Sequence, residues 1–311
     1  MTDDKGIALA RETLARFDFF SGAEASVLDI RRLGGLTNLV FRVASDKDVI
    51  CLRLPGEGTQ EFIDRKVEAH NARAAAAAGI APEVIYADPD SGLMVTEFLD
   101  GYETMSPSLF ASRTGAVSRA GKAFAKLHNS GQTFEFRFEL FSMIDEYLEI
   151  LSKKNVEFPD GYHDVLEDTR AVREALNKRQ GKLAPCHCDP LCENFLDDGT
   201  TMWIVDWEYS GMNDPMWDLG DLSVEGSFDA SADQNMMNAY FPGGPGDSDM
   251  GAMVIYKAMC DLLWTLWGLI QHANQNPAED FWAYSSGRFE RCRTLMADKE
   301  FAMHLAALRN A

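Results

Sequence analysis

Between residues 183 and 225, acidic and amide side chains recur at spacings that suit phosphoryl transfer. His187 and Asp189 are separated by one residue, Asn194 follows Asp189 after five, and an apolar run ends at Asp206. Asn194 and Asp206 offer the oxygen ligands that Mg²⁺ prefers when it also binds phosphates. Asp189 then remains to orient and deprotonate an attacking hydroxyl, as the loop aspartate of the H-x-D-x-x-x-x-N pattern does. The spacing predicts a phosphotransfer centre; an acidic, solvated hairpin with a buried histidine is the alternative.

The local sequence indicates how these groups come together. Pro190 disfavours helix for the residues before it, so the segment around Asp189 is predicted to be a loop. Residues 194–196 and 201–205 flank the turn sequence Asp-Asp-Gly at 197–199, which is typical of a β-hairpin. Such a hairpin places the start of its first strand, Asn194, beside the end of its second, Asp206.

The first hundred residues predict a five-stranded lobe with one helix. Strands are expected near 27–30, 39–43, 49–54, 84–86 and 93–98, and helices at 3–16 and 61–79. The glycine turn at 34–38 carries Thr37 and Asn38, which suit phosphate contacts, although a plain hairpin fits equally. Arg53 on the third strand can serve as the cation that holds ATP phosphates, or it can be an exposed strand arginine. Glu68, midway along the second helix, can pair with Arg53 or lie on the surface.

Beyond a hinge at Gly101 the pattern is almost wholly helical. Helices are expected at 106–128, 141–154, 162–179 and 250–274, the next one begins near Pro277, and residues 227–249 are expected to be rich in loops. The chain is therefore predicted to be α+β and bilobal, with an N-terminal nucleotide-binding lobe at 1–99 and a catalytic and substrate-binding lobe at 100–311.

Composition narrows the partners. The 311 residues carry a formal net charge of −20, which argues against nucleic acid and anionic membranes and favours a cationic ligand. The 250–274 helix is interrupted by charges at 257 and 261, so it is not expected to span a membrane. Six cysteines without a secreted-type framework, and an acidic N-terminus, predict a reduced, cytoplasmic protein. Cysteines at 186, 188 and 192 around His187 are too crowded for a tetrahedral zinc site.

Aromatic residues in the C-terminal part have two interpretations. Trp264, Trp267 and Gln271 fall on one helical face, and Tyr284 follows on the next helix. Core packing is one interpretation. The other is an aromatic cage for a quaternary ammonium, whose charge is attracted to ring faces.

The sequence resembles the choline/ethanolamine kinase family, within the wider group of aminoglycoside-phosphotransferase-like kinases. The residues that carry the resemblance occur in family order over nearly the whole chain. They are Gly34-Gly35-Leu36-Thr37-Asn38, Ile50-Cys51-Leu52-Arg53, the run HCDPLCEN at 187–194, the run VDWEYSGMNDPMWDLG at 205–220, Glu225, and Trp264-Thr265-Leu266-Trp267.

This resemblance implies a bilobal protein-kinase-like fold that transfers the γ-phosphate of ATP to the hydroxyl of choline or ethanolamine. It implies that Asp189 is the base, and that Asn194 and Asp206 hold Mg²⁺. By position, the residues implied near the nucleotide are Thr37, Asn38, Arg53 braced by Glu68, and the hinge pair Glu97 and Phe98. Those implied in the choline pocket are Tyr209, Glu225, Trp264, Trp267 and Tyr284, while His187 and Asp218 would brace the catalytic loop.

Two other functions remain open on sequence alone. One is a related kinase acting on another amino or hydroxyl metabolite, such as an aminoglycoside. The other is a non-catalytic protein that binds a quaternary ammonium on the same fold. Intact Asp189, Asn194 and Asp206 speak against the latter, because a binding protein has no need of all three.

Overall fold

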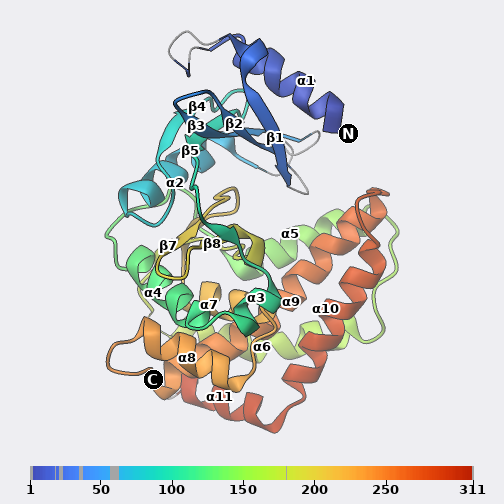
Figure 1. Cartoon of the computed structure of the whole chain (residues 1–311). Coiled ribbons are helices and arrows are strands. Elements are labelled where there is room, and N and C mark those ends of the chain that lie inside the picture. Colours follow the sequence, from blue (N-terminus) through green and yellow to red (C-terminus); the bar gives the residue numbers. More distant parts are fainter. Residues whose placement is uncertain are drawn as a thin grey trace.

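The N-terminal part is an antiparallel sheet of five strands in the order β1-β2-β3-β5-β4 (Figure 1). In this computed structural model the described residues are 3–17, 19–20, 24–34, 38–56, 63–179 and 181–309. The bounds here are α1 Asp3–Leu14, β1 Asp29–Gly34, β2 Leu39–Ala44, β3 Val49–Leu54, α2 Arg65–Ala77, β4 Val84–Ala87 and β5 Met94–Glu97. Alternating apolar residues of β1 to β3 and β5 pack with α1 into a small hydrophobic cluster. The five predicted strands are present, and the helices predicted at 3–16 and 61–79 correspond to α1 and α2.

Helix α2 lies between this sheet and the rest of the chain. Asp64 caps its N-terminus by accepting hydrogen bonds from the amides of Lys66 (2.9 Å) and Val67 (3.3 Å). Gly79, with φ of +69°, lets the chain turn away after the last helical turn. The alanine face of α2 packs into the larger of the two hydrophobic clusters. The helix therefore links the sheet to the helical part of the chain.

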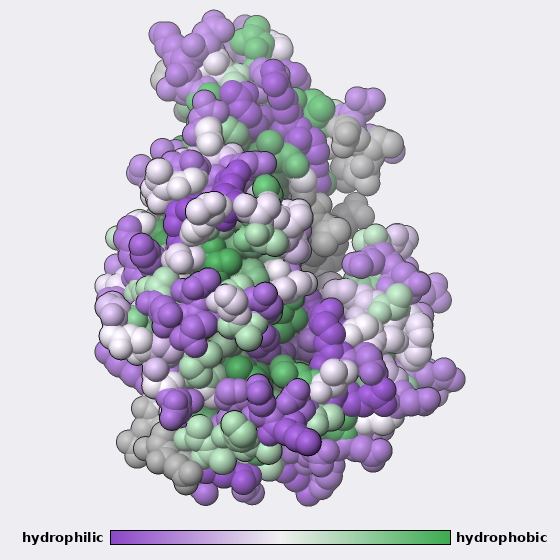
Figure 2. Space-filling view, turned by 60° about the horizontal axis from the view of Figure 1, so that its bottom comes forward, coloured by the Kyte–Doolittle hydropathy of each residue, from purple (hydrophilic) through white to green (hydrophobic). Residues whose placement is uncertain are grey.

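The C-terminal part is built around α9, whose 27 residues pack against α5, α7, α10 and α11. Its helices are α3 Pro107–Ser112, α4 Ala116–His128, α5 Leu140–Ser152, α6 Tyr162–Lys178, α7 Pro215–Glu225, α8 Ala230–Tyr240, α9 Asp247–Ala273, α10 Phe281–Met296 and α11 Lys299–Arg309. By length and composition α9 could cross a membrane, but 83% of its most apolar window is buried inside the protein. It is the core helix of this part. The view in Figure 2 shows hydrophilic residues over most of the surface, with apolar residues scattered among them.

Short strands carry the segment that the sequence singled out. They are β6 Glu103–Thr104, β7 Ala184–Cys186, β8 Phe195–Asp197, β9 Met202–Ile204 and β10 Gly211–Asn213. Strands β8 and β9 form the predicted hairpin, with Phe195 opposite Ile204, and β6 adds to its outer edge. Strand β7 pairs with β10. The loop from 187 to 194 therefore connects this two-stranded sheet to the sheet of β6, β8 and β9.

Three expectations about the helices are wrong. The helix predicted over 106–128 is broken into α3 and α4, because the chain passes through Gly115 at φ of +75°. The segment 227–249 is not mainly loop: α8 occupies half of it, capped by Asp229, whose side chain accepts from the amide of Ala232 at 2.8 Å. The helix expected to begin near Pro277 begins instead at Phe281, where Asp280 caps it.

Candidate active site

The loop that carries Asp189 is held by α7. The carboxylate of Asp218 accepts hydrogen bonds from the backbone amides of His187 (2.7 Å) and Cys188 (2.8 Å), and its Oδ2 also lies 3.0 Å from Nε2 of His128. The indole of Trp217 donates to the carbonyl of Cys188 at 3.0 Å. Cys188 has φ of +67°, a conformation that a non-glycine residue keeps only when its surroundings impose it. These contacts impose it, and they fix the backbone immediately before Asp189.

His187 joins this loop to the hairpin and stays neutral. Its Nε2 donates to the carbonyl of Val205 at 2.9 Å, and its ring packs on Trp207 at 4.8 Å between centroids. Burial lowers the pKa of His187 despite the nearby carboxylate of Asp218. A neutral, buried imidazole bonded to a backbone carbonyl is suited to bracing the loop rather than to proton transfer.

The hairpin brings Asn194 and Asp206 together. The amide of Val205 donates to the carbonyl of Asn194 at 2.9 Å, so Asp206 follows directly beside it. The side chain of Asn194 donates to the carbonyl of Asp189 at 3.1 Å, which ties the loop to the hairpin. Asp206, like Cys188, is held at φ of +67°. The predicted proximity of the three residues is therefore present in the structure.

Arg53 faces the same centre from β3. It forms an ion pair with Glu68 of α2, and its Nη1 also lies 3.3 Å from Oδ1 of Asp206. Glu68 is bound from its other side by Arg65 at 2.8 Å. Glu68 is not a surface charge, because only 2% of the residue is exposed. The pairing of Arg53 with Glu68 thus links the sheet, α2 and the hairpin.

Glu208 belongs to this cluster and was not singled out from the sequence. It accepts a hydrogen bond from the side chain of Asn38 at 3.0 Å and lies 3.4 Å from Nη1 of Arg65. Single oxygens of Glu68, Asp206 and Glu208 all lie within 4.8 Å of one another. The available signal was only that Glu208 is an acidic residue two positions after Asp206.

The donor set of this cluster fits Mg²⁺. Asp206, Glu208 and Asn194 supply carboxylate and amide oxygens, which are the ligands of a hard divalent cation that also binds phosphate. When bound, the cation would neutralise phosphate charge.

In metal-free protein, Glu208 is expected to make the free energy of unfolding fall as the pH rises from about 4.5 to about 7. Burial, followed by the charge of Asp206, raises the pKa of Glu208 from 4.5 to about 7. Between these values the folded chain keeps a proton that the unfolded chain has lost, so rising pH favours unfolding. Glu208→Gln should remove this part of the slope, roughly 2–3 kcal/mol over the window. Urea unfolding in EDTA across this pH range measures it, and identical slopes in both proteins would contradict it.

Asp189 lies between two groups of acidic side chains. Burial raises the pKa of Asp189 well above its ordinary value, and the negative charges of Glu225, Asp206 and Glu208 raise it further, while Arg288 opposes them. A carboxylate with a raised pKa is a stronger base than an ordinary aspartate. Carboxylates of the Asp206–Glu208 cluster and Glu225 of the predicted acceptor pocket therefore both act on the charge of this side chain.

The predicted acceptor pocket is a chain of aromatic rings in edge contact. Ring centroids are 5.7 Å apart for Tyr209 and Trp264, 6.4 Å for Trp264 and Trp267, and 5.8 Å for Trp267 and Tyr284. Trp264 is 4% exposed and belongs to the core, whereas the other three rings are only partly buried. Trp264 therefore packs in the core and contacts rings that are partly exposed.

Glu225, the carboxylate predicted in the acceptor pocket, is already paired with another side chain. It forms an ion pair with Arg288 of α10, whose guanidinium lies 4.7 Å from the ring centroid of Tyr284. The sequence did not single out Arg288. A spacing of four residues from Tyr284 on one helix was the signal that could have found it.

The residues predicted at the nucleotide are in part described. Asn38 is 2% exposed and reaches Glu208, next to the metal cluster. Glu97 ends β5 opposite Ile50, with its side chain exposed, and Phe98 follows under the guanidinium of Arg42 at 5.3 Å. Thr37 lies outside the described residues.

Cys186 forms a close group of metal-ligating atoms with His128 and Asp218 rather than with His187. In the described part of the chain, no such group joins His187 to the cysteines. Burial raises the pKa of Cys192 to about 12, and those of Cys186 and Cys188 well above the ordinary value. These side chains are buried thiols that pack the underside of the loop.

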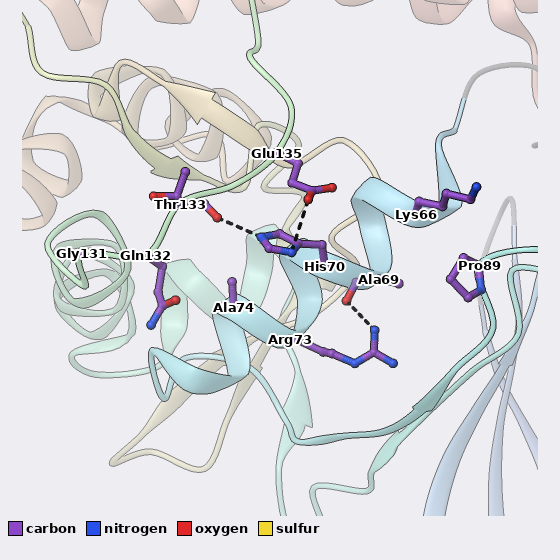
Figure 3. A pocket seen from close by; sticks show the side chains of 10 residues that line it. All are labelled: Lys66, Ala69, His70, Arg73, Ala74, Pro89, Gly131, Gln132, Thr133 and Glu135. Atoms are coloured by element: carbon purple, nitrogen blue, oxygen red, sulfur yellow. Dashed lines mark hydrogen bonds and ion pairs between the residues drawn. The ribbon is translucent and has the colours of Figure 1, made fainter.

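A cavity of about 670 Å³ lies elsewhere, on the outer face of α2 (Figure 3). His70 points from α2 toward the segment after α4, with Nε2 3.1 Å from the carbonyl of Thr133 and Nδ1 3.7 Å from Glu135. One residue further, the buried side chain of Asn71 bonds the carbonyl of Ser210 (2.9 Å) and the amide of Glu135 (3.0 Å). These contacts fasten α2 to the helical part, behind the ion pair of Glu68.

Comparisons with known proteins point to one family. Residues 30–240, more than half of the chain, match the choline/ethanolamine kinase family. The crystal structure of a choline/ethanolamine kinase family protein from Mesorhizobium loti has 56% sequence identity and a TM-score of 0.91, covering 98% of this chain and 100% of that one. Protein LicA of Haemophilus influenzae is 27% identical over 275 residues, 86% of this chain and 79% of LicA.

The fold is shared more widely than the sequence. The structure of choline kinase LicA from Streptococcus pneumoniae, 24% identical, has a TM-score of 0.77 over 93% of this chain and 98% of that one. The predicted α+β, protein-kinase-like fold is confirmed. The chain belongs to the choline/ethanolamine kinase family, and it is an ATP-dependent phosphotransferase whose acceptor is an alcohol.

Proposed function

We propose that this enzyme transfers the γ-phosphate of ATP to the hydroxyl of choline or ethanolamine. The observation that carries the proposal is the position of Asp189, whose pKa is raised by burial, by Glu225 from the acceptor side, and by Asp206 and Glu208 from the metal side. A base in that position can serve a hydroxyl held between the ammonium pocket and the phosphates.

In this proposal Asp189 accepts the hydroxyl proton. The hydroxyl oxygen forms a bond to the γ-phosphorus while the bond from that phosphorus to the β–γ bridging oxygen breaks, and ADP leaves with that oxygen. The chain contributes mainly position, because the loop is fixed through Asp218 and the hairpin through Asn194.

In this proposal the nucleotide binds beside the acidic cluster of Glu68, Asp206 and Glu208. Asn194 and Asp206, joined by Glu208, would hold Mg²⁺, and Arg53 braced by Glu68 would bind phosphate oxygens. Asn38 and Thr37 would lie near the phosphates, and the segment of Glu97 and Phe98 would face adenine. On this division residues 1–99 act as the nucleotide-binding lobe and 100–311 as the catalytic lobe.

The acceptor side combines ring faces with a carboxylate. Tyr209, Trp264, Trp267 and Tyr284 would surround the ammonium group, since aromatic faces attract a cation without needing a hydrogen bond. Glu225, which is paired with Arg288, would lie at one end. An aminoglycoside, which carries many N–H groups, calls for more carboxylates than this row of rings provides.

A coupled ADP-release assay with choline, ethanolamine, homoserine and an aminoglycoside tests the proposal. ADP release should depend on Mg²⁺ and should be fastest with choline or ethanolamine. Preference for homoserine or the aminoglycoside would reassign the acceptor. ATP binding without turnover on any alcohol would overturn the proposed reaction itself.

Trp267→Ala is expected to raise the KM for the preferred amino alcohol roughly 30-fold, because a desolvated cation–π contact contributes roughly 2 kcal/mol. The KM for ATP should change little. Trp282→Ala is the matched control, since Trp282 lies on α10 against His272, with ring centroids 5.8 Å apart. Equal effects of Trp267→Ala on both KM values would show a packing role instead.

A further inference from the structure

One face of α7 runs from the catalytic loop to the acceptor pocket. Asp218, Asp221 and Glu225 are spaced by three and four residues, so they lie on the same side of the helix. Asp218 holds the amides of the loop, and Glu225 lies at the aromatic row. Asp221 lies between these two positions.

The charge of Glu225 is already balanced before a substrate arrives. Its partner Arg288 is only 5% exposed and is also bound by Asp261 at 3.1 Å. Asp261 is held in turn by Arg291 at 2.6 Å. A cationic substrate therefore meets a carboxylate that is bound to an internal guanidinium.

Asp221 is different, because in the described part of the chain only one of its two carboxylate oxygens accepts a hydrogen bond. The residue is 1% exposed, and its Oδ1 accepts a hydrogen bond from the thiol of Cys260, with Sγ at 2.8 Å. Within the part of the chain that the structure describes, no group donates to its Oδ2. A buried carboxylate oxygen without a donor is costly, so a donor from a ligand would relieve a cost that the free enzyme bears.

Asp221 lies beside the carboxylate of Glu225. One of its oxygens and one of Glu225 lie within 4.8 Å of each other, with Cys260 at the third corner. Burial raises the pKa of Asp221 well above its ordinary value, and the charges of Glu225 and Asp189 raise it further. Asp221 is therefore close to both the base and the ammonium end of the proposed pocket.

We propose that Asp221 is a specificity-determining residue, which accepts an N–H hydrogen bond from the substrate and selects amino alcohols that retain at least one N–H group. The inference rests on the proposed function and adds the class of amine. A nitrogen at ordinary hydrogen-bond distance, about 2.8–2.9 Å, can reach at once two oxygens that lie within 4.8 Å of each other. A quaternary ammonium cannot donate, so it leaves the Asp221 oxygen unpaired, although the rings still attract its charge.

A methylation series tests this on the wild-type enzyme. Ethanolamine, N-methylethanolamine, N,N-dimethylethanolamine and choline share one hydroxyl and differ only in methyl and N–H groups. The kcat/KM should change little while one N–H remains, and it should fall roughly 10- to 100-fold at the last step, to choline, because a hydrogen bond to a charged group is lost there. A choline value equal to or above that of the dimethyl compound would overturn the inference while leaving phosphotransfer intact.

Substitutions of Asp221 test whether this residue causes the fall in kcat/KM between N,N-dimethylethanolamine and choline. Asp221→Asn removes the charge and Asp221→Leu also removes the acceptor, so the drop between the dimethyl compound and choline should shrink in the first and vanish in the second. The KM for ATP should stay unchanged. Cys260→Ala is the matched control, since it removes the donor to the other oxygen and should keep the drop. An undiminished drop in folded Asp221→Leu would overturn the assignment, and no turnover with any of the four alcohols would overturn the proposed function and this inference with it.

Discussion

Asp189→Ala should abolish phosphotransfer while leaving the affinity for Mg-ATP nearly intact. Removal of a general base costs roughly 10²- to 10⁴-fold in rate, and the loss should appear in kcat. Mg-ATP binding should survive because the side chain of Asp189 makes none of the contacts that join Arg53, Glu68 and Asp206. Single-turnover kinetics with separate measurement of ATP binding distinguishes the two effects.

The isosteric change Asp189→Asn is the stringent version. It keeps the volume of the side chain and the hydrogen bond from Asn194 to its backbone carbonyl, so the loop should stay in place. Its rate should nevertheless fall as far as that of the alanine variant. A near-wild-type rate in either variant would refute the role of Asp189 as base.

Asp206→Asn should lower kcat/KM at fixed Mg²⁺ by roughly 10²-fold or more. Loss of a group that merely orients a metal ligand typically costs 10- to 100-fold, and loss of a ligand itself should cost at least as much. The change also removes the charge that faces Arg53 at 3.3 Å, so phosphate binding should suffer together with metal binding. Titration of activity with Mg²⁺ should show a higher half-saturating concentration.

Asp198→Asn is the control for this change. Asp198 lies at the exposed tip of the same hairpin, where it accepts from Thr200 and Thr201 at 2.7 Å. This control should leave the Mg²⁺ dependence unchanged. If Asp206→Asn kept the wild-type dependence on Mg²⁺, the metal cluster would be misassigned.

The parts of the site that sequence could predict are those set by neighbouring residues. The β8–β9 hairpin follows from its turn sequence, and it alone brings Asn194 to Asp206. Pairing of Arg53 with Glu68 was one of two open readings, and burial in the structure decided between them.

The parts that sequence could not predict depend on packing between distant elements. Arg288 reaches Glu225 only because α10 packs along α9, and Asp221 meets Cys260 only because α7 does so too. Gly220 permits that approach, since a Cβ there would lie 2.7 Å from the carbonyl oxygen of Met253. The break at Gly115 was equally hidden, because glycine inside a helical pattern does not by itself specify a left-handed residue.

The central claim is that one hydroxyl, held beside Asp189, receives the γ-phosphate. Phosphorus NMR of a reaction containing the wild-type enzyme, ATP, Mg²⁺ and ethanolamine tests it most directly. A phosphomonoester signal that grows in equal amount with ADP, and that is absent with Asp189→Asn, is the predicted result. Growth of inorganic phosphate in place of the ester, or the same ester signal from Asp189→Asn, would contradict it.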